Sequence, residues 1–191
     1  MAYEAHFDRT TDVSIEDRRR KLRRISRVAE WVSLGGIAAA VAYCGYLCSH
    51  PAALIAYLTK DIPHVAITPT DDSIIVAGMF SLIPVAIFIV WMWEARRLFR
   101  LLGKSQSLDP AAPRLLVRLG GLAFAAAISS IVARTLVVLA MTLANPPGQQ
   151  HLLIGVSSSD VASLIAALLF FAFALMAQEF LRIEDENRSI V

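Results

Sequence analysis

One arginine lies where a charged side chain is costly. Arg134 is the single charged residue of the apolar segment 119–143, which is long enough to cross a lipid bilayer. An arginine near the middle of such a segment costs about 2.5–3.5 kcal/mol on insertion scales, so it should face a bundle interior or water and have a partner. The best partner is Asp160, at the start of the next apolar segment. We predict an Arg134–Asp160 pair, with three serine hydroxyls nearby: Ser157, Ser158 and Ser159.

Two interpretations of this pair are open. It could belong to a site for a substrate, an ion or a proton, or it could be an interhelical tie that holds two helices together. The tie is favoured because a proton relay or a transporter usually has a carboxylate well inside a membrane span. The sequence has none there, since Asp160 lies at the edge of its apolar segment.

The other residues that could carry chemistry indicate no site. His50, His64 and His151 are irregularly spaced, so we predict no metal centre. Cys44 and Cys48 lie one turn apart in an apolar segment, where they are badly placed to bridge each other and serve as packing residues. The sequence contains no nucleophile–base pair, phosphate-binding loop or paired carboxylates. We therefore expect neither an enzyme nor a cofactor.

Four long apolar segments must position these residues. Hydrophobic residues make up 57% of the 191-residue chain and charged residues only 18%, whereas soluble domains average about 45–50% and about 25%. Each segment approaches the roughly 20 residues of a membrane-spanning helix, and none alternates as a strand of a membrane barrel would. We predict an all-α integral membrane bundle of four transmembrane helices, spanning about 31–49, 73–93, 119–143 and 161–178. A kinked continuation of the first span past Pro51 is left open.

The distribution of positive charge indicates the orientation. Of the 18 lysines and arginines, all but Lys60 and Arg134 lie in residues 1–30, in residues 94–118 or after residue 178. Cytoplasmic loops carry the excess of these residues in membrane proteins. We therefore predict that both termini lie in the cytoplasm and that the protein is a multi-pass protein of the cytoplasmic (inner) membrane.

The basic segment 1–30 is predicted to contain an amphipathic helix over 14–32, capped by Ser14, that lies beside the membrane. Its basic face could contact anionic lipid headgroups or a cytoplasmic partner, and headgroups are the favoured contact. We expect no direct binding to nucleic acid. The predicted contact residues, including those of the next cytoplasmic loop, are Arg18, Arg19, Arg20, Lys21, Arg23, Arg24, Arg27, Arg96, Arg97 and Arg100.

The loop 94–118 is predicted to form a helical hairpin between the second and third spans. Gly103 would end the first helix in the left-handed conformation, and Asp109 followed by Pro110 would begin the second. An acidic cytoplasmic tail, residues 179–191, would follow the fourth span.

The chain resembles a bacterial membrane family, domain of unknown function 2975 (DUF2975), over roughly residues 30–191. Three groups of residues carry the resemblance: Glu94–Leu102 leading to Leu108-Asp109-Pro110, Asn145-Pro146-Pro147-Gly148 with Ser157-Ser158-Ser159-Asp160, and the tail from Glu184 to Val191. The resemblance implies four transmembrane helices and no established chemistry. It also implies a partner, because genes of such proteins often lie beside one for a small helix-turn-helix transcription regulator.

Three functions are compatible with these features. The leading hypothesis is a non-enzymatic membrane anchor or sensor that binds a cytoplasmic partner such as a helix-turn-helix regulator. The alternatives are a small oligomeric transporter or channel that uses Arg134, and a structural or assembly subunit of a larger membrane complex.

Overall fold

The protein is built from α-helices alone in the part described by the computed structural model, which is residues 2–60, 70–104, 109–142, 145 and 155–189. This confirms the predicted all-α class. The five helices are α1 (Ala2–Ser49), α2 (Pro51–Thr59), α3 (Asp71–Lys104), α4 (Ala111–Thr142) and α5 (Ser158–Ser189).

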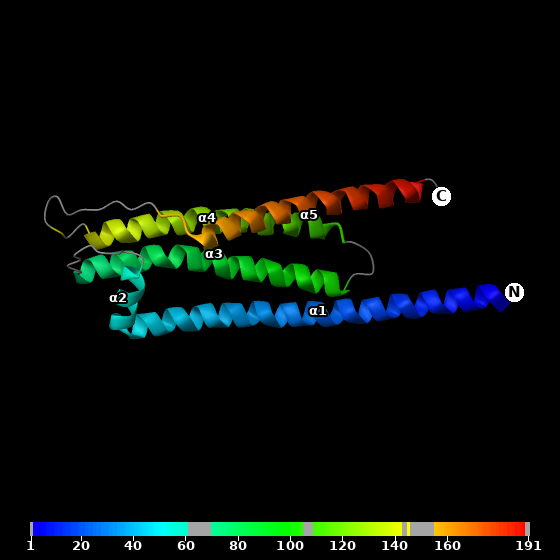
Figure 1. The fold of residues 1–191 in the computed structure, drawn as a ribbon, viewed down its shortest axis with the longest axis horizontal. Helices are drawn as coiled ribbons and strands as arrows, with labels where there is room; N and C mark the ends of the chain where they lie inside the picture. Colours follow the sequence, from blue (N-terminus) through cyan, green and yellow to red (C-terminus); the bar gives the residue numbers. More distant parts are fainter. Residues whose placement is uncertain (1, 61–69, 105–108, 143–144, 146–154, 190–191) are drawn as a thin grey trace.

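Four of these helices are long and apolar enough to cross a membrane, as predicted. The candidate spans are Arg23–Ser49, Asp71–Gly103, Ala111–Thr142 and Ser158–Ile183. Helices α1, α3, α4 and α5 run alongside one another, and both termini lie at the same end of the bundle (Figure 1). Large apolar side chains such as Leu168 and Leu175 are exposed on the outside of the bundle. An apolar outer surface suits lipid rather than water, so the protein is a multi-pass membrane protein.

Helix α1 differs from the prediction. We expected a separate helix to begin at Ser14, but α1 is one continuous helix of 48 residues from Ala2 to Ser49. The physical reason lies in the sequence, which has no glycine or proline before Gly35. A serine can cap a helix but does not interrupt one when the residues before it also favour helix. The basic segment is therefore the first part of the first span's own helix.

The chain turns sharply after α1 instead of continuing with a kink. His50 leaves the helical conformation, with φ −127° and ψ 89°, and Pro51 begins α2. A proline restricts the residue before it and is favoured at the first position of a helix, so this dipeptide ends one helix and starts the next. Helix α2 crosses from α1 toward α3 (Figure 1). Its Leu58 is 4% exposed and packs in a cluster with Val137 and Val138 of α4.

The hairpin between α3 and α4 is partly as predicted. The Asp109 carboxylate accepts a hydrogen bond from the Ala111 backbone N–H at 2.8 Å, which is the predicted cap. Gly103, however, does not end α3, which continues to Lys104. A Cβ atom at Gly103 would lie 2.7 Å from the Ser26 Oγ, so this glycine allows α1 to approach α3 closely.

Two apolar clusters hold the helices together. One joins α2, α3 and α4 far from the termini and contains Ala77 and Met141. The other joins α3 and α4 near the termini and contains Leu98 and Leu119. Each cluster packs beside a polar region of the bundle, so the helices that carry the polar side chains are held in place by apolar packing.

Candidate functional site

Helix α5 begins with a reciprocal cap. Ser157 precedes the first helical residue, and its hydroxyl oxygen accepts a hydrogen bond from the Asp160 backbone N–H at 3.4 Å. The Asp160 carboxylate accepts one from the Ser157 backbone N–H at 2.7 Å. This is the capping-box arrangement, which satisfies N–H groups that the first helical turn leaves without partners. It fixes the Asp160 carboxylate at the positive end of the α5 dipole.

Arg134 of α4 reaches this carboxylate. Its Nη1 lies 3.4 Å from Asp160 Oδ2 and donates to the Gly155 carbonyl oxygen at 2.9 Å, while Nη2 donates to Ser157 Oγ at 3.3 Å. The Asp160 side chain is 2% exposed and that of Arg134 is 20% exposed. The structure therefore brings together the two residues that the sequence analysis paired, on adjacent helices and largely out of contact with solvent or lipid.

The three predicted serines differ in their positions. Ser157 contacts both charged side chains, and Ser159 lies within hydrogen-bond distance of the Ser157 hydroxyl, at 2.7 Å. Ser158 is exposed at the first position of α5 and has no hydrogen bond to either charged residue in the described part of the chain. Of the three serines predicted near the pair, Ser157 and Ser159 therefore belong to its hydrogen-bond network, and Ser158 does not.

Two further groups complete the network and were not predicted. The Ser130 hydroxyl donates to Asp160 Oδ1, and the Gly155 carbonyl accepts from Arg134. Ser130 precedes Arg134 by one helical turn, so helical spacing alone could have identified it as a neighbour on the same face. The Gly155 carbonyl carried no such signal, because its position depends on the path of the chain before α5.

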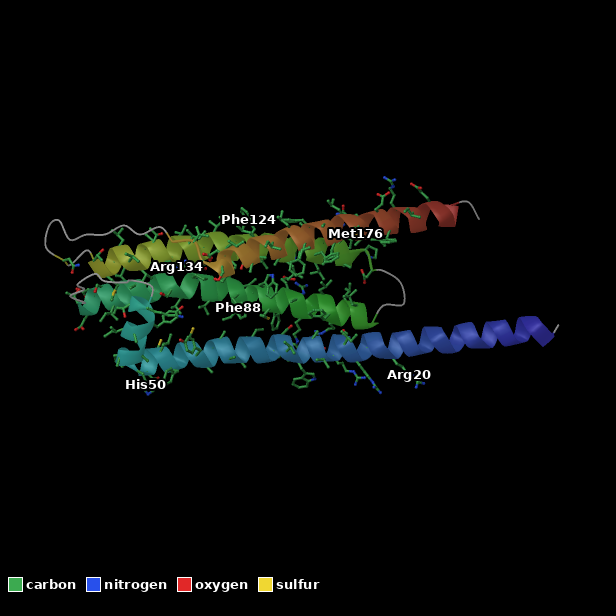
Figure 2. All side chains as sticks on the ribbon, viewed as in Figure 1. Arg20, His50, Phe88, Phe124, Arg134 and Met176 are labelled. Atoms are coloured by element: carbon green, nitrogen blue, oxygen red, sulfur yellow. The ribbon has the colours of Figure 1, made fainter. Side chains whose placement is uncertain are left out.

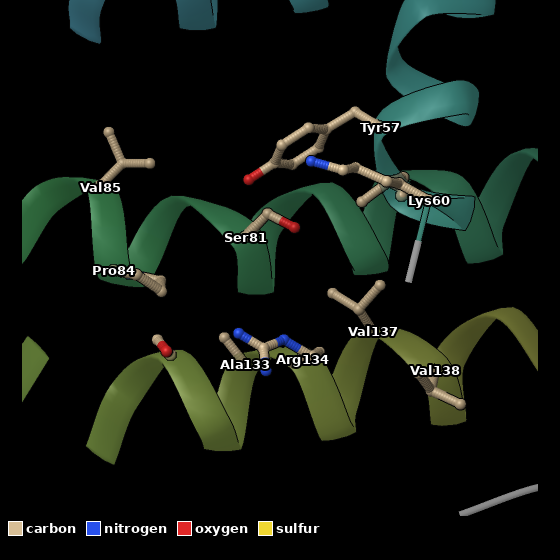
Figure 3. A pocket seen from close by; sticks show the side chains of 11 residues that line it. Tyr57, Lys60, Ser81, Pro84, Val85, Ala133, Arg134, Val137 and Val138 are labelled. Carbon is tan, nitrogen blue, oxygen red and sulfur yellow. The ribbon is translucent and has the colours of Figure 1, made fainter. Parts of the chain in front are cut away.

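A cavity of about 250 Å³ borders Arg134 on the side of α2 and α3. We call it the Arg134 cavity. Figure 3 shows Tyr57 and Lys60 at the α2 end, Ser81 from α3 and Arg134 from α4 around it. The remaining wall is mostly apolar and includes Pro84, Val85, Val137 and Val138.

The other polar region lies at the end of the bundle that holds the termini. A groove of about 400 Å³ is lined by four arginines around an apolar floor, and we call it the arginine groove. The floor includes Leu101 and Leu115. The arginines are Arg97 and Arg100 from α3 and Arg114 and Arg118 from α4.

Two glutamates partly neutralise this region. Glu94 lies 3.2 Å from Arg97 Nη1 and 3.9 Å from Arg118 Nη1. Glu30 of α1 accepts from Arg96 Nε at 3.2 Å and from Arg100 Nη2 at 3.0 Å, which joins α1 to α3.

The predicted basic face of α1 lies near the same end. Arg20, labelled in Figure 2, is exposed there. The next three arginines along α1 are exposed as well: Arg23, Arg24 and Arg27. The side chains of Arg18, Arg19 and Lys21 lie outside the described part of the structure.

His50 and the two cysteines are not among the residues that line either polar region. His50 Nδ1 is 3.1 Å from the Tyr46 carbonyl oxygen, and its ring stacks on Tyr46. Cys44 and Cys48 are free thiols. His64 and His151 lie outside the described residues. Among the residues that are described, no three histidine, cysteine, aspartate or glutamate side chains gather as metal ligands would.

Comparison with known protein families gives a match over most of the chain. The model of a family described as a protein of unknown function, DUF2975, matches residues 37–191. No curated protein and no solved structure matches the chain. The matched region includes α2 to α5, the Arg134 cavity and the arginine groove, whereas the basic first part of α1 lies before it. The chain therefore belongs to the DUF2975 family.

Proposed function

We propose that this protein is a non-enzymatic anchor or sensor of the cytoplasmic membrane that holds an acidic cytoplasmic protein at the arginine groove. One observation carries the proposal, which is the concentration of arginines around an apolar floor at the end of the bundle where both termini lie. Positive charge predominates on the cytoplasmic side of membrane proteins, which supports a cytoplasmic location for this end.

The chemistry of the groove favours an acidic partner. Its four arginines outnumber the two glutamates, Glu30 and Glu94, that contact them or their neighbours. Arg114 has no ion pair with any described residue. Arginine binds carboxylates through two parallel hydrogen bonds, and an apolar floor adds the buried contact area that arginines alone do not supply. An acidic amphipathic helix has both of the features that such a groove recognises.

The family resemblance suggests which cytoplasmic protein this is, namely a small helix-turn-helix transcription regulator. The bundle would hold the regulator at the membrane and away from DNA. The exposed arginines of α1, such as Arg23 and Arg27, lie toward the same end, where they would contact either the partner or anionic headgroups.

The test is a cross-linked pull-down of the tagged full-length protein from native membranes, with mass spectrometry of the captured proteins. We expect a small DNA-binding protein, and we expect the double variant Arg97→Gln/Arg114→Gln to capture about thirtyfold less of it, because each lost interface arginine costs about 1 kcal/mol. Arg182→Gln is the matched control, since Arg182 is exposed on α5 and contacts only Glu179 and Glu186 among the ion pairs described.

Other results of the pull-down would contradict the proposal. Equal capture by the double variant would remove the groove as the binding surface. Capture of integral membrane proteins alone would favour an assembly subunit of a larger complex.

A second candidate function is favoured by a different observation. The Arg134 cavity borders an arginine inside a candidate span, as expected of a small transporter or channel. This function predicts that only copies of the protein are captured, and that purified protein in liposomes carries an anion flux that Arg134→Leu reduces.

A further inference from the structure

The Arg134 cavity has features that an interhelical tie does not need. The tie is made toward α5, through Asp160, Ser157 and the Gly155 carbonyl. The cavity opens toward α2 and α3 instead, where it meets Tyr57 and Lys60. A tie would be equally strong with an apolar wall on that side, so the polar residues there call for a separate explanation.

The charges around the cavity favour an anion. Two cations, Arg134 and Lys60, are among its described lining residues, and no aspartate or glutamate is. Asp160 contacts Arg134 from outside the cavity and balances one of the two positive charges. Lys60 has no ion pair with any residue that the structure describes. Among the described residues, one positive charge at the cavity is therefore left unbalanced, and a ligand with a single negative charge would balance it.

Two serine hydroxyls that line the cavity already donate hydrogen bonds within the protein. Ser81 donates its proton to the Ala77 carbonyl oxygen at 3.0 Å, and Ser130 donates to Asp160. These two hydroxyls are therefore not free to donate to a ligand. The charged donors at the cavity are the ammonium group of Lys60, which has three N–H groups, and the guanidinium of Arg134.

The remaining wall favours an apolar part on the same ligand. Pro84, Val85, Val137 and Val138 line the cavity without offering a side-chain hydrogen bond. Ligand sites are typically apolar with a few placed polar groups, and a volume of about 250 Å³ suits a small molecule or one end of a larger one. Hydrocarbon placed against this wall would be removed from water, which favours binding of an apolar group.

We infer that the Arg134 cavity binds a monoanionic amphiphile, with one oxyanion head held by Lys60 and Arg134 and an apolar part against Val85, Val137 and Val138. The head could be the carboxylate of a free short-chain acid or the phosphodiester of an anionic lipid, which share this chemistry. The inference does not depend on partner binding at the arginine groove, because it concerns the opposite end of the bundle. It also does not require the transport that the second candidate function assumes, because the test measures binding alone.

The test measures butyrate binding to the purified full-length protein in nanodiscs of phosphatidylcholine. Line broadening of ¹³C-butyrate in NMR spectra reports binding, and neutral 1-butanol and cationic butylammonium serve as competitors that should fail. Lys60→Met should weaken binding about tenfold or more, because it removes a charge-assisted hydrogen bond. Lys60→Arg should restore binding to within about threefold, since the charge and the donors return. Lys60 is exposed, so neither change threatens the fold.

A second arm distinguishes the lipid from the free acid. The same protein in nanodiscs that contain phosphatidylglycerol is examined by native mass spectrometry and by the butyrate assay. Retention of phosphatidylglycerol on the wild type, its loss from Lys60→Met and its competition with butyrate would support the lipid headgroup. Butyrate binding that phosphatidylglycerol does not alter would support the free acid.

The control variant is Arg118→Met, which removes a cation from the arginine groove at the other end of the molecule. It should leave butyrate binding unchanged, which separates the cavity from the groove. The inference is overturned if neither anion binds, if 1-butanol competes as well as butyrate, or if Lys60→Met binds both anions as the wild type does.

Discussion

The two polar regions of the molecule use arginine in opposite ways. At the Arg134 cavity, one arginine and one carboxylate are held by a helix cap, a serine and a backbone carbonyl, and Asp160 is almost fully buried. At the arginine groove, the side chains of Arg97 and Arg118 are 54% and 65% exposed and share a single glutamate, Glu94. One region has a buried ion pair held by several hydrogen bonds, and the other has exposed arginines that share one carboxylate.

This difference follows from the surroundings of the charges. A buried ion pair is costly to separate, because each partner would remain in a medium that solvates it poorly. An exposed pair is screened by water and salt and contributes little to stability. The first region therefore suits a fixed position in the bundle, whereas the second can exchange its internal glutamates for the carboxylates of a partner.

The largest expected effect comes from breaking the buried pair. Asp160→Ala should destabilise the protein by about 3–5 kcal/mol, because it leaves the Arg134 charge without its carboxylate. The change also removes one half of the α5 cap. Unfolding in mild detergent, followed by circular dichroism, measures the loss. The double variant Arg134→Leu/Asp160→Leu should be more stable than Asp160→Ala, and a double variant that is less stable would show that burial of the pair is not the cause.

A smaller effect should follow from removing the hydroxyl that supports the carboxylate. Ser130→Ala deletes a hydrogen bond to a buried charged group and should cost about 1.5–3 kcal/mol in the same unfolding assay. The adjacent Ser129 is a matched control, since its hydroxyl donates to the Ala126 carbonyl of its own helix and to no other described residue. Equal losses in Ser129→Ala and Ser130→Ala would mean that the network around Asp160 adds nothing to the fold.

The contact between α4 and α5 should also depend on close packing at Gly120, which lies at a distance from the Arg134–Asp160 pair. A Cβ atom at Gly120 would lie 3.0 Å from the Phe171 ring and 3.2 Å from the Ala167 carbonyl oxygen, so Gly120→Ala should cost about 1–3 kcal/mol through overpacking. The neighbouring Gly121 has nothing within 4 Å of the same position. Gly121→Ala should therefore be neutral or slightly stabilising, and unfolding midpoints of the two variants compare them directly.

The sequence was sufficient to predict features that depend on the free energy of a short segment by itself. Long uncharged segments specified the four spans, and an arginine inside one of them required a partner at a matching depth in the next. Asp109 followed by Pro110 specified a helix start, because this combination satisfies the first backbone N–H groups.

Features that depend on how helices meet could not be obtained in this way. Ser14 fits a helix start and a helix interior equally well, and only the continuous α1 decides between them. Gly103 fits a helix end, but its contact with Ser26 depends on the register between α1 and α3. The Arg134 cavity likewise requires the turn at His50, which brings Tyr57 and Lys60 of the α2 region over α3 and α4.

The smallest expected effect concerns Glu30, the acid that joins α1 to α3. Glu30→Gln removes the charge that Arg96 and Arg100 share, so the part of α1 near Glu30 should open more often and exchange its amide hydrogens faster at low salt. Hydrogen exchange of the protein in nanodiscs measures this difference. Because the Glu30–Arg100 pair is partly exposed, salt screens it, and the difference between variant and wild type should shrink at high salt. Glu179→Gln is the control, since its partner Arg182 lies on the same helix and this pair connects no two helices. A difference that persists at high salt would mean that Glu30 acts as a fixed tie like Asp160, and the contrast between the two ends of the molecule would then be wrong.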